Sequence, residues 1–154
     1  LMVRAGTQVR FLATVQGSRA VRVGDRQGEV MPAHSASAGK AMLAQLGLPA
    51  VKDLYLLESR INGAEFDQSW FASFEQELIA ANRRGFAVNL EETEVGANAL
   101  GVAIRDGAGE VVAGLSVSIP PVRFRQMFEA GLPMAVFAAR GRIEAGLEDF
   151  IAGQ

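Results

Sequence analysis

Alternation between apolar and polar positions predicts two β-hairpins and one further strand. The stronger hairpin reverses at Asp106-Gly107-Ala108-Gly109, because acidic and glycine residues suit a tight turn. The other hairpin is predicted to reverse at Gln16-Gly17-Ser18, and the polar residues 25–33 are interpreted as a loop. The predicted strands cover residues 7–15, 20–24, 86–90, 98–105 and 110–119.

Apolar residues that recur every three or four positions predict five helices. The clearest begins at Asp67 or Ser69 and ends before Gly85, a residue type that suits a helix C-terminus. Its apolar stripe, which we expect in the core, consists of Trp70, Phe71, Phe74, Leu78 and Ala81. The predicted helices cover residues 35–45, 49–58, 67–84, 122–130 and 133–151. This order of elements predicts one α+β domain with an antiparallel sheet of about five or six strands flanked by helices.

Composition narrows the class of protein. The chain has 154 residues, enough for one core, with 15 Lys and Arg against 17 Asp and Glu and a net charge of −2. That balance argues against this chain binding a nucleic-acid backbone by itself. The lack of cysteine excludes disulfides and thiolate metal sites, and the single histidine, His34, argues against a histidine-based metal site. We therefore expect no metal and no cofactor.

The ends and hydropathy of the chain give two further expectations. No apolar run approaches the length of a membrane span, and no signal-peptide pattern opens the sequence, so we expect a cytoplasmic protein that does not contact a membrane. The chain begins Leu1-Met2-Val3 rather than with a clear initiator, which predicts that it is part of a longer protein.

The segment from Met31 to Ala44 is the first candidate for binding. It has the pattern of a loop that turns into a helix, and Ser35 or Ser37 could cap the first turn through a hydroxyl. Two interpretations stay open: the free N–H groups of the helix bind an anion, or the helix packs closely on a sheet, which this segment alone favours. The small residues behind both interpretations are Ala36, Ala38, Gly39 and Ala41.

Two serines in the last predicted strand are the second candidate. Ser116 and Ser118 point to one face of the strand, and Leu115, Val117 and Ile119 point to the other. The serines either lie on an exposed face of the sheet or line a cavity in which they fix a polar ligand.

A run of acidic residues, Glu91-Glu92-Thr93-Glu94, is the third candidate. A solvated connection is the favoured interpretation, and paired carboxylates for acid–base chemistry are the alternative. His34 and Ser35 are adjacent, but no acid partner completes a catalytic triad, and neither a phosphate-binding loop nor a nucleophile elbow is present. We therefore predict that the protein is not an enzyme, against the alternative of a small enzyme that uses Glu91, Glu92 or His34.

Three segments, in this order and spacing, resemble the effector-binding domain of the IclR family of bacterial transcriptional regulators. The first runs from Met31 to Ala44 around Ala38-Gly39-Lys40-Ala41. The second runs from Arg83 to Glu92 and is followed by Gly96. The third is the hairpin from Leu100 to Pro120, which ends in Ser-Val-Ser-Ile-Pro where the family has Ser-Val-Ser-Gly-Pro.

The resemblance implies a GAF-like fold over residues 1–154, with a pocket between sheet and helices for a small organic effector, often a carboxylic or aromatic acid. It also implies an N-terminal winged helix-turn-helix domain that is absent from this chain and through which alone the full-length protein would bind DNA. Family members form dimers and often tetramers, so we expect a homodimer or homotetramer. The alternative is a GAF- or PAS-like sensor of another signalling protein, with His34 as the ligand of a haem.

Carried over position by position, the resemblance assigns the effector pocket to Val23, Ser37, Ala38, Gly39, Asn89, Ala97, Ala99, Ser116 and Ser118. Asn89 stands where the family often has an acidic residue. Ala99 stands where some members have a larger or sulfur-bearing side chain. Both departures predict a less charged and roomier pocket, and neither allows the ligand of another member to be carried over.

Overall fold

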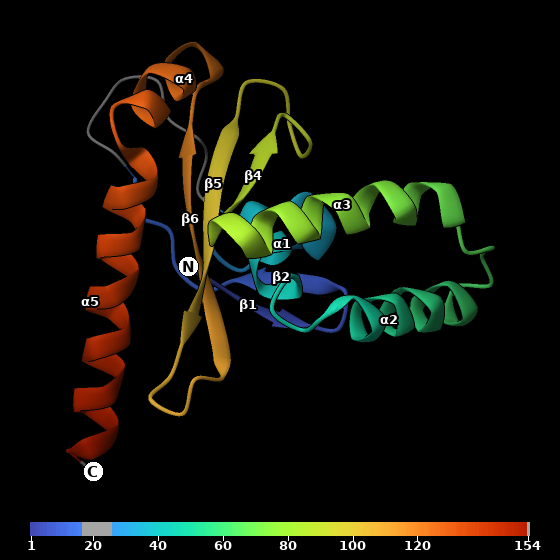
Figure 1. Cartoon of the computed structure of the whole chain (residues 1–154), viewed down its shortest axis with the longest axis horizontal. Helices are drawn as coiled ribbons and strands as arrows, with labels where there is room; N and C mark the ends of the chain where they lie inside the picture. The colour runs from blue at the N-terminus through green and yellow to red at the C-terminus, as the bar shows by residue number, and fades with distance from the viewer. Residues whose placement is uncertain (17–25, 154) are drawn as a thin grey trace.

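The computed structural model describes residues 1–16 and 26–153. Within them a single antiparallel sheet is flanked by helices on both faces, as the sequence predicts (Figure 1). The strands are β1 (Met2–Ala5), β2 (Gln8–Phe11), β3 (Val30–Pro32), β4 (Ala87–Leu90), β5 (Asn98–Arg105) and β6 (Val111–Ile119). The helices are α1 (Ser37–Leu43), α2 (Leu48–Ile61), α3 (Gln68–Arg84), α4 (Pro121–Glu129) and α5 (Leu132–Ala152), with a 3₁₀ turn at Ala33–Ser35 before α1.

The sheet has the strand order β3-β2-β1-β6-β5-β4. The β5–β6 hairpin lies between β1 and β4 and pairs from Asn98 with Ile119 to Arg105 with Val111, which confirms the stronger predicted hairpin. Helices α1, α2 and α3 lie on one side of the sheet, and α4 and α5 lie on the other (Figure 1). Each side therefore has its own apolar core.

The structure contains a first hairpin that the sequence did not predict. It pairs Met2–Ala5 with Gln8–Phe11 around a two-residue turn, in which Gly6 has a φ of 57°, a conformation that glycine adopts without steric cost. Of the predicted strand 7–15, only Gln8–Phe11 forms a strand, and its neighbours in the sheet are β1 and β3. The predicted strand 20–24 and the predicted turn residues 17 and 18 lie outside the described residues.

Strand β3 falls inside the segment predicted as a polar loop. It is three residues long and pairs with β2, placing Met31 opposite Val9. A strand this short shows no readable alternation, so its existence depends on the neighbouring strand rather than on its own sequence.

Helix α3 follows the sequence closely. Asp67 caps it, because its carboxylate accepts the N–H groups of Ser69 and Trp70 at 2.9 Å each. Gly85 ends it with a φ of 80°. The predicted stripe is buried except for Trp70, whose side chain lies at the surface.

Helix α1 begins later and ends earlier than predicted, and its predicted serine cap is wrong. Ala36 occupies the cap position with no side-chain hydrogen bond. The hydroxyl of Ser35 instead donates to the Pro32 carbonyl at 3.0 Å, and that of Ser37 pairs with Ser116. A local hydrogen bond thus engages the Ser35 hydroxyl, a tertiary one engages that of Ser37, and neither caps the helix.

Small residues let α1 lie directly on the β5–β6 hairpin. A Cβ atom added to Gly101 would lie 2.1 Å from the backbone nitrogen of Ala38, and one added to Gly114 would lie 2.9 Å from the Ala38 Cβ. A Cβ atom added to Gly39 would lie 2.3 Å from the carbonyl oxygen of Ala33 in the 3₁₀ turn. Ala38 therefore serves close helix–sheet packing, one of the two interpretations left open by the sequence, and Gly39 serves close packing of α1 on the 3₁₀ turn.

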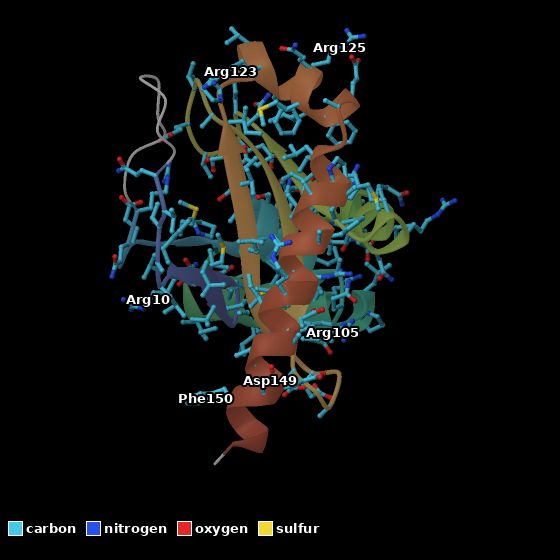
Figure 2. All side chains as sticks on the ribbon, turned by 90° about the vertical axis from the view of Figure 1, so that its left-hand side faces the viewer. Arg10, Arg105, Arg123, Arg125, Asp149 and Phe150 are labelled. Carbon is cyan, nitrogen blue, oxygen red and sulfur yellow. The ribbon has the colours of Figure 1, made fainter. Side chains whose placement is uncertain are left out.

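On the opposite face, α5 crosses the sheet and carries Asp149 and Phe150 near its C-terminal end (Figure 2). Arg105 of β5 is tied to α5, because its backbone N–H donates to the Glu144 carboxylate at 2.9 Å. None of the helices in the described ranges combines the length and hydropathy that crossing a bilayer requires.

Candidate functional site

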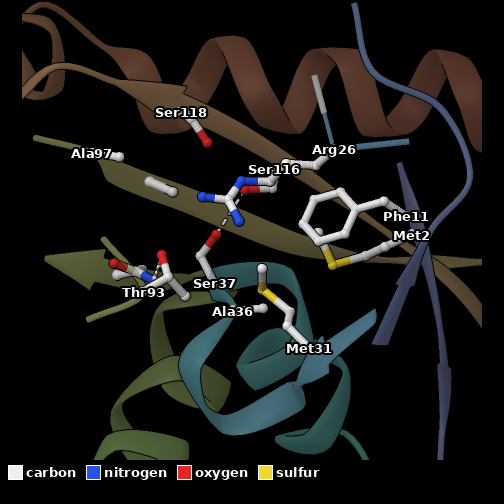
Figure 3. A pocket seen from close by; sticks show the side chains of 12 residues that line it. Met2, Phe11, Arg26, Met31, Ala36, Ser37, Thr93, Ala97, Ser116 and Ser118 are labelled. Atoms are coloured by element: carbon white, nitrogen blue, oxygen red, sulfur yellow. Dashed lines mark hydrogen bonds between the residues drawn. The ribbon is translucent and has the colours of Figure 1, made fainter. Parts of the chain in front are cut away.

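A pocket opens between the N-terminal half of the sheet, the start of α1 and the β4–β6 strands (Figure 3). It contains about 380 Å³ of empty space when its open mouth is included. Its lining consists of Met2, Phe11, Arg26, Met31, Ala36, Ser37, Asn89, Thr93, Ala97, Ala99, Ser116 and Ser118. These residues are far apart in the sequence, and the sheet brings them together.

Strand pairing explains why the serines line the pocket. Ser116 lies opposite Gly101 and Ser118 lies opposite Ala99 in the β5–β6 ladder, so all four occupy the sheet face that α1 covers. The hydroxyls of Ser37 and Ser116 are hydrogen-bonded at 2.8 Å. Ser118 is exposed at the mouth. Three hydroxyl groups thus converge on one wall, each able to donate or accept a hydrogen bond.

Asn89 lies at the pocket but is largely engaged in holding the backbone around it. Its side chain is buried, and its amide N–H groups donate to the Ser35 carbonyl and to the Thr93 hydroxyl. Its amide oxygen accepts the Glu92 N–H at 3.0 Å. Asn89 therefore joins β4 to the loop before α1 and to the acidic loop, and one acceptor site on its oxygen is left for a ligand.

The structure gathers six of the nine predicted pocket residues around one space. They are Ser37, Asn89, Ala97, Ala99, Ser116 and Ser118. Ala38 and Gly39 do not line it, because they are buried against the hairpin and the 3₁₀ turn. Val23 lies outside the described residues.

The sequence did not predict Arg26, the cationic side chain among the described residues that line the pocket. It also did not predict the residues at the apolar end of the pocket. In the view of Figure 3 the Arg26 guanidinium is drawn in front of the Ser37–Ser116 hydrogen bond, and all three residues line the pocket. One end of the guanidinium donates to Glu94 and the other lies 3.3 Å from the Glu29 carboxylate. Met2, Phe11 and Met31 make the apolar end of the lining. Only pairing of the first three strands brings these residues together, so no local pattern could have marked them.

The acidic loop between β4 and β5 is anchored rather than simply solvated. Glu92 accepts a salt bridge from Lys40 at 2.7 Å, and Glu77 of α3 accepts a second at 2.8 Å. The Lys40 side chain is only 3% exposed, so both carboxylates compensate a charge removed from water. The Glu91 carboxylate accepts the Gly96 N–H at 2.7 Å. Glu91 and Glu92, the acids considered for acid–base chemistry, thus each have a structural partner.

His34 packs away from the pocket, in an aromatic cluster. Its ring lies 5.1 Å from that of Trp70, 5.9 Å from that of Tyr55 and 6.2 Å from that of Phe74. Burial lowers the pKa of His34, although the carboxylate of Glu58 opposes the effect. Within the described ranges, no group of three or more His, Asp or Glu residues could hold a metal ion.

Solved structures of other proteins share this fold. The regulator YaiJ superposes with a TM-score of 0.80 at 21% identity, covering 95% of this chain and 82% of that one. The Thermotoga maritima IclR structure superposes with a TM-score of 0.77 at 23% identity, covering 95% of this chain and 59% of that one. The chain therefore has the fold of these two proteins.

The family model described as bacterial transcriptional regulator IclR C-terminal matches residues 1–145, and the chain belongs to this family. The repressor AllR of Escherichia coli K12 is 28% identical over 80% of this chain and 46% of its own length. The regulator BhcR of Paracoccus denitrificans is 28% identical over 92% of this chain and 51% of its own length. KdgR of Dickeya chrysanthemi is 30% identical over 69% of this chain and 35% of its own length. The chain therefore spans about half the length of the first two.

Proposed function

We propose that the chain is the effector-sensing domain of an IclR-family transcriptional regulator, and that its effector is a small carboxylic acid. The observation that carries the proposal is that Arg26 lines the same pocket as Ser37 and Ser116, whose hydroxyls are hydrogen-bonded to each other. A guanidinium presents a planar fork of N–H donors that matches a carboxylate. Hydroxyl groups can add hydrogen bonds to the same anion.

The shape of the lining supports an effector with an apolar part. The pocket that holds Arg26 and the serines also has an apolar surface, formed by Met2, Phe11 and Met31. A carboxylate bound at Arg26 would place its hydrocarbon or aromatic portion against these three side chains. A few convergent polar groups in an otherwise apolar pocket are typical of small-molecule sites.

In this proposal the chain transmits binding rather than contacting DNA. The relatives AllR, BhcR and KdgR are named helix-turn-helix regulators and are about twice as long or longer. A separate region of the full regulator would bind DNA, and the domain would act through homodimers or homotetramers. Its effector can shift the regulator between two states only by binding one of them more tightly.

The experiment compares acids with their amides. The purified chain is heated in the presence of acetate, butyrate or benzoate, and in parallel with acetamide, butyramide or benzamide. A ligand of the folded state raises the melting temperature. At least one acid is expected to raise it while the matching amide does not. A rise that is equal for acid and amide, or absent with all three acids, would overturn the carboxylate proposal.

A further inference from the structure

Negative charge exceeds positive charge around Arg26 at the pocket. Arg26 is the cationic side chain among the lining residues of the described chain, and two carboxylates, Glu94 and Glu29, already hold it. One positive charge therefore faces two negative charges. A third anion that approaches Arg26 is repelled unless one of the two carboxylates moves away.

The two carboxylates differ in where they come from. Glu29 follows Arg26 by three residues and lies 3.3 Å from its guanidinium. Glu94 belongs to the loop between β4 and β5, 68 residues along the chain, and makes the shorter contact. Glu94 therefore joins two separate segments across the edge of the pocket, whereas Glu29 belongs to the same segment as Arg26.

The acidic loop can release Glu94 without being displaced itself. On one side of Glu94, Glu92 is fixed by Lys40 at 2.7 Å. On the other side, the Gly96 N–H is held by the Glu91 carboxylate at 2.7 Å. The Glu94 side chain is 44% exposed, so rotation about its own bonds moves its carboxylate into water, where solvation offsets most of the lost ion pair.

We infer that Glu94 is an internal competitor for the effector. Its carboxylate holds the guanidinium of Arg26, and an effector carboxylate displaces it from the same N–H donors. The inference rests on the proposed function, because it requires an anionic effector in this pocket. Because an acid must first displace Glu94 from Arg26, its affinity is lowered, and this competition sets the effector concentration at which the domain responds. The conformation of the Glu94 side chain then depends on whether an acid is bound in the pocket.

The test is a calorimetric titration of the wild-type chain and of Glu94→Gln with acetate, butyrate and benzoate and with their amides. Glutamine keeps the size of the side chain and removes its charge. We expect Glu94→Gln to bind the acids about two- to fivefold more tightly, the range for losing one ion-pair competitor near the surface. Binding of the amides should not change. Glu65→Gln, which alters the net charge equally at an exposed residue outside the pocket, is the matched control and should leave acid binding as in the wild type.

A double-mutant cycle separates competition for Arg26 from a general electrostatic effect. In an Arg26→Gln background the donor is absent, so Glu94→Gln should give no gain in affinity for the acids. Acid binding that is equal in the wild type and Glu94→Gln would overturn the inference and leave the proposed function standing. A gain that persists in the Arg26→Gln background would also overturn it. If none of the three acids binds to either form, both the inference and the proposed function fail.

Discussion

The two faces of the β5–β6 hairpin show how one pair of strands serves two purposes. The face towards α4 and α5 carries large apolar residues: Leu100, Val102, Leu115, Val117 and Ile119. The face towards α1 carries small or hydroxylated residues: Ala99, Gly101, Gly114, Ser116 and Ser118. The first face fills a core. The second face permits α1 to pack directly on the strands and leaves a pocket beside the helix.

Small residues have two distinct uses on the α1 face. At Gly101 and Gly114 there is no room for a side chain, because Ala38 occupies the space. At Ala97 and Ala99 the short side chain instead leaves room beside the serines. The sequence of the strands does not distinguish a position that packs against α1 from one that opens on the pocket, since both positions have small residues.

The largest effect is expected from Gly101→Val. Its Cβ would lie 2.1 Å from the Ala38 nitrogen, which is backbone and cannot turn aside. We expect a loss of more than about 3 kcal/mol in the free energy of unfolding, measured in urea, because overpacking must displace the whole of α1.

The matched control is Gly141→Ala in α5, where an added Cβ meets nothing within 4 Å. Alanine is the better helix former by about 1 kcal/mol, so this variant should be as stable as the wild type or more so. If Gly101→Val is as stable as the control, the close packing of α1 on the hairpin is incorrect.

Leu100→Ala tests the other face of the same strand. Leu100 is fully buried in the core under α4 and α5. Truncation should cost about 2–5 kcal/mol in urea unfolding, as is usual for leucine in a packed core. Affinity for an acid in the pocket should be retained, because the side chain points to the opposite face. A selective loss of affinity with little loss of stability would contradict the division of roles between the faces.

The double variant Ser116→Ala, Ser118→Ala should show the reverse pattern. Each neutral hydrogen bond contributes about 1 kcal/mol, so we expect roughly a five- to thirtyfold loss of affinity for the acid that raises the melting temperature, with the fold retained. Calorimetric titration measures the affinity, and circular dichroism checks the fold. The control is Ser73→Ala on the exposed surface of α3. Unchanged affinity in the double variant would remove the serines from the effector site.

The smallest effect concerns His34, which precedes α1 on the side away from the pocket. Burial lowers its pKa in the folded state below the ordinary value of 6.5. Between the two pKa values the unfolded chain binds more protons, so stability is retained above pH 6.5 and falls as the pH is lowered through that value. This loss of stability is complete once the pH is below the pKa of His34 in the folded state.

His34 is the only histidine of the chain, so the variant His34→Gln isolates this contribution. Urea unfolding of both proteins at several values between about pH 7 and pH 5 should give a difference in stability that narrows as the pH falls. A difference that is independent of pH would mean that His34 has the same pKa in both states.

The sequence by itself determined the elements whose signals are local. The turn at Asp106–Gly109, the cap at Asp67 and the stop at Gly85 each depend on neighbours within a few residues, so the β5–β6 hairpin and α3 were predictable. The family motifs likewise placed six of nine predicted residues around the pocket, because their spacing follows from the same strands and helix.

Only the tertiary structure decided the rest. Strands β1 and β3 have four and three residues, and their pairing depends on partners rather than on any pattern of their own. The same pairing brings Arg26 to the pocket and to Glu94, 68 residues away. Whether Gly101 supports a helix or Ser116 opens on a cavity depends on where α1 lies, because packing between distant segments fixes the space that each side chain meets.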